Sequence, residues 1–304
     1  MRDKTKGNIA LLTTAIVWGT GFIGQKLGMA TLPAIGFNGS RQFLAMFVLL
    51  PIALAGLKKS GYFDKTANSI AVLDERYRRT LKGGLVCGIF MSLGTNLQQI
   101  GLVTVSAGKS GFITAIYIVL VPLFSIFLGV KLTKKVVLCC TIAMVGFAFL
   151  SLRGGLGGIT AGDWLTLASA ACFALQIIAV NYFVDKDNDL TISVIQMFVT
   201  GVSSLLISFI FENYTWGGFV ACLPVLIYMA CVPTAIGFTL QIVGQKYTDS
   251  TTASFLMSLE SVFAVIFGAL ILGEHMSGKE LIGCVLIFVA NLLIQMGDAE
   301  KKEA

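Results

Sequence analysis

One carboxylate stands near the middle of a long apolar stretch. Residues 250–272 read STTASFLMSLESVFAVIFGALIL, in which Glu260 is the only formally charged residue. An ionised carboxylate at the centre of a lipid bilayer costs roughly 2.5–3.5 kcal/mol on insertion scales, so such residues generally face protein or water. We therefore expect Glu260 either to bind a cationic group or a coupling proton, or to make a structural hydrogen bond to a neighbouring helix.

A second charged residue, Arg41 in FNGSRQF, also lies inside an apolar stretch. At 1.5 Å per residue it sits roughly 9–12 Å from the outer end of its predicted helix. It could meet a substrate carboxylate, or it could snorkel toward the outer surface and cap backbone carbonyls there. We favour snorkelling, and we do not assume an Arg41–Glu260 ion pair because the two expected depths differ.

Four neutral amides also occur in apolar stretches: Asn96, Gln98, Gln99 and Gln241. Such groups either line a pore or hydrogen-bond across helices, a contact worth well under ~2 kcal/mol. Gln98 and Gln241 occupy matching positions of an internal repeat, which favours symmetric helix packing for that pair. Asn96 and Gln99 are therefore the predicted cavity residues.

Two aromatic residues, Trp18 and Phe22, are one turn apart on one face of the first apolar stretch. They could stack on an aromatic or cationic substrate. Simple packing is the more common role of an aromatic side chain in a membrane helix.

The composition indicates what must position these residues. Only 12% of the residues are charged, 56% are hydrophobic, and the mean hydropathy is +0.86. Soluble domains contain about 25% charged residues, so the chain is predicted to be an integral membrane protein in a lipid bilayer. The basic residues cluster in short segments between apolar stretches, which encodes membrane topology rather than a surface for nucleic acid.

Signatures of catalysis and of metal binding are missing from the sequence. His275 is the only histidine, and all seven cysteines lie inside apolar stretches, where they are typical packing residues. No HExxH motif, P-loop or pair of intramembrane aspartates occurs, and Asp163 stands at a helix start, where it is predicted to cap the helix. We predict no enzyme activity and no cofactor, so any transport is passive or ion-coupled.

Apolar stretches of roughly 17–25 residues predict helical spans. Ten are present, at 8–27, 34–56, 83–103, 107–129, 135–152, 161–183, 190–211, 219–241, 250–272 and 280–297. With the N-terminus inside, 17 Lys and Arg residues fall in cytoplasmic segments and 4 in outer ones, while Arg41 lies in a span. Both termini are therefore predicted to be cytoplasmic. The long segment 57–82 is predicted to be a cytoplasmic loop with a short surface helix.

An internal repeat predicts the architecture. GTNLQQIG at 94–101 matches GFTLQIVG at 237–244 with an offset of 143, and VPLFSIFLG at 121–129 matches ESVFAVIFG at 260–268 with an offset of 139. The matches occur in consistent order, as two copies of a five-helix unit would produce. Because five is odd, the second copy enters the membrane from the opposite side, an architecture common in secondary transporters.

The predicted fold is thus all-α, with ten transmembrane helices arranged as two inverted five-helix repeats. The repeats are predicted at 7–153 and 160–297, followed by a cytoplasmic tail at 298–304. The offset of 139 places Val121 opposite Glu260 and Tyr117 opposite Leu256. We therefore predict that Thr114, Tyr117 and Val121 form a cavity-facing stripe across from Glu260.

Three segments resemble a known family: WGTGF at 18–22, SAGKSGFITAIYIVLVPLFSIFLG at 106–129 and LESVFAVIFGALILGEHMSGKELIGCVLIF at 259–288. They are similar to the EamA-type, ten-helix branch of the drug/metabolite transporter superfamily. The chain departs from that pattern where Ser261 follows Glu260, since many members have proline there, although Pro122 is kept at the matching place. The first repeat also lacks the LGE element found at 272–274.

The resemblance implies a plasma-membrane transporter of small organic metabolites, often amino acids, that works by alternating access. We predict a secondary transporter coupled to H⁺ through Glu260, present as a monomer or homodimer. The alternative is a channel, or a non-transporting membrane receptor or scaffold of the same fold.

Overall fold

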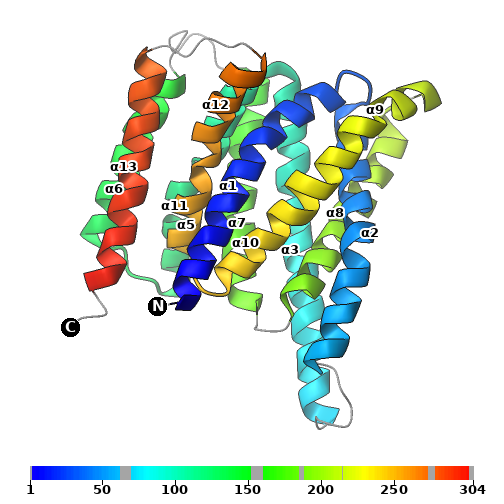
Figure 1. Cartoon of the computed structure of the whole chain (residues 1–304), viewed down its shortest axis with the longest axis horizontal. Helices are drawn as coiled ribbons and strands as arrows, with labels where there is room; N and C mark the ends of the chain where they lie inside the picture. Colours follow the sequence, from blue (N-terminus) through cyan, green and yellow to red (C-terminus); the bar gives the residue numbers. More distant parts are fainter. Residues whose placement is uncertain are drawn as a thin grey trace.

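The computed structural model describes residues 2–61, 70–151, 160–184, 188–213, 215–272 and 278–300. Within these ranges every regular element is a helix, and the helices lie side by side in one bundle (Figure 1). Eight helical segments are long and apolar enough to cross a membrane. The prediction of an all-α membrane protein is confirmed. His275, Gly273 and Glu274, with the last four residues of the predicted tail, lie outside the described residues.

In the first half of the chain the described residues form helices joined by short connections. In order they are α1 (Arg2–Gly28), α2 (Ala34–Ser60), α3 (Ile70–Thr104), the broken segment α4 (Ala107–Thr114), α5 (Tyr117–Ser125) and η1 (Ile126–Leu128), and α6 (Lys134–Ser151).

The second half of the chain is also helical throughout its described residues. It contains α7 (Ala161–Phe183), α8 (Asp189–Phe211), the segment α9 (Trp216–Met229), η4 (Ala230–Ile236) and α10 (Gly237–Gln245), the broken segment α11 (Ser250–Ser258) and α12 (Glu260–Leu272), and α13 (Gly278–Glu300). The α6 and α13 helices pack against each other along one edge of the bundle, at the left of Figure 1. Helix α1 begins and α13 ends at the same, lower end of the bundle.

Helix α3 is longer than predicted. It begins at Ile70, inside the segment predicted to be a loop with a separate surface helix, and it extends below the bundle in Figure 1. The added turns carry an ion pair of 3.0 Å between Asp74 and Arg78, four residues apart. Such a pair supports an exposed helix, so the charged residues that suggested a loop in fact continue the helix into water.

Two spans are broken at equivalent places. Ser106 caps α4 and Asp249 caps α11, each accepting a hydrogen bond from the backbone N–H three residues later. Measured from these caps, Tyr117 and Glu260 hold the same position, each starting the half-helix after the break. The predicted equivalence of Glu260 with Val121 is therefore wrong by one helical turn. Because a shift of four residues keeps the same helix face, apolar letters match almost as well in either register.

A third irregularity lies in the segment 216–245. Residues Ala230–Ile236 form a π-helical stretch with Pro233 inside it. Proline lacks a backbone N–H, and π-helical turns often occur at functional sites. The carbonyl oxygen of Pro233 accepts a hydrogen bond of 3.0 Å from the indole nitrogen of Trp18 on α1. This irregular turn thus fixes an aromatic side chain at the centre of the bundle.

Candidate functional site

A cavity lined mostly by buried side chains lies where α1, α2, α3 and α7 meet the three irregular segments. Its open space is about 40 Å³. The walls combine two charged residues with aromatic and amide side chains. The lining residues are Trp18, Gly21, Phe22, Gln25, Arg41, Thr95, Gln98, Thr114, Tyr117, Phe173, Gln176, Ile177, Pro233, Phe238, Gln241 and Glu260.

Glu260 is the acidic group of this cavity. It is the first residue of α12 and only 4% exposed. The hydroxyl of Tyr117, the first residue of α5, donates a hydrogen bond of 3.0 Å to Glu260 Oε1. The start of a helix favours a negative group because the backbone N–H groups there are partly unpaired. The two helix breaks therefore bring the acid and its hydroxyl partner together.

Arg41 is the basic group of the same cavity. It is 4% exposed, and its Nε and Nη2 donate hydrogen bonds of 3.2 and 3.0 Å to Oδ1 of Asn38, one turn earlier on α2. The predicted snorkelling of Arg41 to the outer surface is therefore wrong, because a side-chain oxygen inside the bundle holds the guanidinium. Among the described residues no ion pair joins Arg41 to Glu260.

The predicted aromatic pair lies at the cavity. Trp18 and Phe22 both line it, and the Trp18 ring is tilted against Phe238 with a centroid distance of 4.8 Å. The hydrogen bond to Pro233 restrains the indole. Both residues of the pair thus present apolar surface to whatever occupies the cavity.

The amides are distributed differently from the prediction. Gln98 and Gln241, assigned to helix packing, line the cavity, where Gln98 Nε2 donates to Thr114 Oγ1 at 2.9 Å and Gln241 Nε2 donates to Gln176 Oε1 at 2.9 Å. Asn96 does not line it.

Contacts of α3 with α2 and α8 explain why Asn96 does not line the cavity. Asn96 bonds to Asn38 of α2 and Ser204 of α8 at 2.8 Å each. The side chain of Gln99 is fully buried, and its amide atoms have no hydrogen-bond partner among the described residues. Successive residues on a helix point about 100° apart, so one face carries Thr95 and Gln98 toward the cavity and its neighbour faces α2 and α8. Three of the cavity residues that sequence reasoning missed, Gln25, Thr95 and Gln176, are polar residues in apolar stretches, the same signal that marked Asn96.

The predicted stripe on the fourth span is partly present. Thr114 and Tyr117 line the cavity. Val121 is fully buried but packs into an apolar cluster with Leu256 and Met257 instead. The structure thus places six of the eight predicted site residues around one cavity, all except Asn96 and Gln99.

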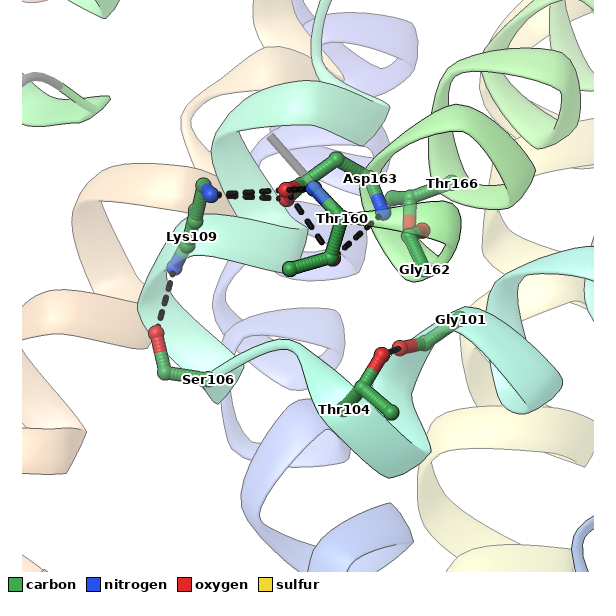
Figure 2. Close-up of polar contacts among 8 residues, drawn as sticks. All are labelled: Gly101, Thr104, Ser106, Lys109, Thr160, Gly162, Asp163 and Thr166. Carbon is green, nitrogen blue, oxygen red and sulfur yellow. Dashed lines mark hydrogen bonds and ion pairs between the residues drawn. The ribbon is translucent and has the colours of Figure 1, made fainter. Parts of the chain in front are cut away.

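A second polar cluster joins the start of α4 to the start of α7 (Figure 2). Asp163 Oδ2 accepts hydrogen bonds from the backbone N–H and the hydroxyl of Thr160, at 2.7 and 3.0 Å, so the predicted helix cap is confirmed as a capping box. The same carboxylate forms an ion pair of 2.8 Å with Lys109 of α4, which the sequence did not indicate. Its side chain is 8% exposed and that of Lys109 is 33% exposed.

Known proteins resemble this chain along nearly all of its length. It is 29% identical over 297 residues to an uncharacterized transporter from Archaeoglobus fulgidus, covering 95% of this chain and 85% of that protein. It is 26% identical over 289 residues to a "Probable terminal-alkyne amino-acid exporter" from Streptantibioticus cattleyicolor, covering 94% and 92%. A solved crystal structure superposes with a TM-score of 0.72 over 99% of both chains at 18% identity, which shows a shared fold.

A family model matches the chain twice, at residues 5–152 and 160–296. The two matches together span almost the whole sequence. Its description is the EamA-like transporter family, a branch of the drug/metabolite transporter superfamily. The protein is a membrane transporter rather than an enzyme, and the chain belongs to the EamA-like transporter family.

Proposed function

We propose that the protein is a secondary transporter that moves a small organic metabolite, such as an amino acid, across the plasma membrane by alternating access. The observation that carries this proposal is the central cavity, which holds Glu260 and Arg41 buried, of opposite charge and not paired with each other. Buried charges are costly unless something compensates them. A polar substrate is the simplest compensating group, and the name of the Streptantibioticus relative supports an amino acid.

The architecture that we propose for this movement is two inverted five-helix units, at 7–153 and 160–297. In it α6 and α13 are the fifth and tenth spans, and both termini are cytoplasmic, as the distribution of Lys and Arg favours. The repeated helix breaks, the separate family matches in the two halves and the common end of α1 and α13 all support this arrangement. Two related units provide two packings of similar energy, one open to each side.

The cavity volume favours a transporter over a channel. About 40 Å³ is well below the ~150 Å³ of a cavity that binds benzene, so an amino acid requires the walls to move before it can enter. A channel instead needs a continuous open path.

Counterflow in proteoliposomes tests the proposal. Vesicles loaded with an unlabelled amino acid are expected to accumulate the labelled one transiently and saturably, because exchange through alternating access needs substrate on both sides. The screen covers the twenty standard amino acids, and protein-free vesicles are the control. Flux that rises linearly with concentration, without stimulation by internal substrate, would support the channel instead.

We expect the Lys109–Asp163 ion pair to help close the outer side of the cavity. Lys109→Gln removes the positive charge but leaves Asp163 bonded to Thr160, so the closed state should lose only about 1 kcal/mol of stability. The population of the state that is open to the outside should therefore rise several-fold. The rate at which an impermeant thiol reagent labels Gln25→Cys from outside, with the native cysteines replaced, should rise by that factor. Lys6→Gln breaks an exposed ion pair and should leave the rate unchanged. Equal labelling rates in the Gln25→Cys parent and in its Lys109→Gln and Lys6→Gln versions would exclude this role of the ion pair.

A further inference from the structure

We propose that Arg41 and Asn38 form a carboxylate-binding site, and that together with Glu260 it makes the cavity selective for zwitterions. The proposal rests on the transport function proposed above, because it names the substrate class of the same cavity. A zwitterion carries one positive and one negative group on a single small molecule.

The positive charge of Arg41 is buried without a negative partner. Its two hydrogen bonds within the described residues both go to one neutral atom, Asn38 Oδ1, and Nη1 makes none. Arg41 lines the cavity and belongs to no ion pair in this part of the chain. A guanidinium removed from water in this way lacks the compensation that buried charges usually have. An anionic group in the cavity would supply it, and a carboxylate fits the planar donor arrangement of arginine.

Asn38 fixes the guanidinium in place. Its Nδ2 donates to Thr95 Oγ1 at 3.0 Å and to Asn96 Oδ1 at 2.8 Å, so the amide cannot turn over without losing both bonds. Asn96 is held in turn by Ser204 on α8. Three helices therefore determine the direction of Asn38 Oδ1, and through it the orientation of Arg41. A binding group held by such a network is positioned before the ligand arrives.

The negative charge has a neutral partner as well. Glu260 accepts from the Tyr117 hydroxyl at 3.0 Å and pairs with no cation among the described residues. Arg41 is held by Asn38 of α2 and Glu260 by Tyr117 of α5, and no ion pair joins the two among the described residues. A ligand with an amino group and a carboxylate would compensate both charges. A simple amine or a simple acid leaves one buried charge uncompensated, which is how a site rejects a near analogue.

Matched ligands test this selectivity. Thermal stability of the purified protein is measured with the twenty standard amino acids and with two triples that differ only in their charged groups. Leucine is compared with 3-methylbutylamine and 4-methylpentanoate, and phenylalanine with 2-phenylethylamine and 3-phenylpropionate. A ligand that binds the folded state raises its apparent stability. At least one amino acid should stabilise the protein, at about tenfold or more lower concentration than its amine or its acid.

Two substitutions separate carboxylate binding from structure. Arg41→Gln should weaken binding of the zwitterion to the level of its amine and leave the amine unchanged. Asn38→Asp should have the same effect while keeping Arg41, because the new carboxylate pairs with the guanidinium. Asn96 Oδ1 faces the replaced Nδ2 at 2.8 Å, so the Asn96 amide has to turn over and donate to the carboxylate, after which the Ser204 hydroxyl can donate to the Asn96 oxygen. If Arg41→Gln does not fold, Asn38→Asp still tests whether Arg41 binds the carboxylate of the ligand.

The results that overturn the proposal are specific. Amines that bind as tightly as the amino acids, or both variants binding the zwitterion like the wild type, would show that Arg41 does not bind a carboxylate. Stabilisation by none of the twenty amino acids would also contradict it. The transporter proposal is judged separately, by counterflow, so it can stand when this one fails.

Discussion

Glu260→Gln is expected to abolish the response of transport to a pH gradient, while substrate exchange at equal pH stays measurable at raised substrate concentration because Arg41 can still bind the carboxylate. Glutamine has nearly the same size as glutamate and can still accept the hydrogen bond from Tyr117, which is 3.0 Å long in the native cavity. It cannot gain or lose a proton. The other titratable or charged side chains lining the cavity are Tyr117 and Arg41, and neither ordinarily changes its charge near neutral pH. Glu260 is therefore the group in this cavity that could carry a coupling proton.

The measurement uses proteoliposomes with an imposed pH gradient and, in parallel, counterflow without one. The wild type should accumulate substrate in response to the gradient, and the variant should lose about a hundredfold of that response or more, as expected when the only exchangeable group is removed. Glu75→Gln is the matched control, because Glu75 is exposed on the part of α3 that extends beyond the bundle. Full transport with an unchanged gradient response in Glu260→Gln would leave Glu260 a structural residue.

Features determined by local chemistry were predictable from the sequence. The lengths of the apolar stretches predicted the helices, because the bilayer sets a minimum length and leaves no backbone polar group unpaired. The same reasoning marked Glu260, since a charge in such a helix must face protein or water. Asp163 was predictable as a cap from its place at a helix start, where partly unpaired backbone N–H groups favour a negative charge.

Features determined by helix rotation and by contacts between helices were not predictable. Gln98 and Gln99 are adjacent in sequence, yet the first lines the cavity and the second does not. The sequence does not indicate which face of α3 lines the cavity, because both faces carry amide side chains. The prediction that Arg41 snorkels to the outer surface is wrong for a related reason. Its hydrogen-bond partner is Asn38, and the direction of the Asn38 side chain depends on contacts with α3 and α8. The break before Glu260 likewise follows no glycine or proline signal in residues 250–260.

The close contact between α3 and α7 depends on two glycines, and Gly162→Ala is expected to destabilise the protein by about 1–3 kcal/mol. A Cβ at Gly162 would stand 2.7 Å from the carbonyl oxygen of Gly101 and nearer still to the Thr104 hydroxyl. The reciprocal contact is as tight, since a Cβ at Gly101 would stand 2.7 Å from the carbonyl oxygen of Gly162. Figure 2 shows the two residues facing each other below the Asp163 cluster.

The sign of this effect is informative because it opposes helix propensity. Alanine normally stabilises a helix by up to about 1 kcal/mol over glycine, so a loss must come from the contact itself. Gly217→Ala, at the start of α9 with nothing within 4 Å of its added Cβ, is the control and should not lower the melting temperature.

Thr104→Ala combined with Gly162→Ala removes the hydroxyl contact alone and should recover only part of the loss of stability, because the backbone carbonyl of Gly101 cannot move aside. Gln98 of α3 and Gln176 of α7 both line the cavity. Because Gly162→Ala forces these two helices apart, the variant should also transport its substrate more slowly. A melting temperature equal to that of the wild type would mean that α3 and α7 pack less tightly than this structure shows.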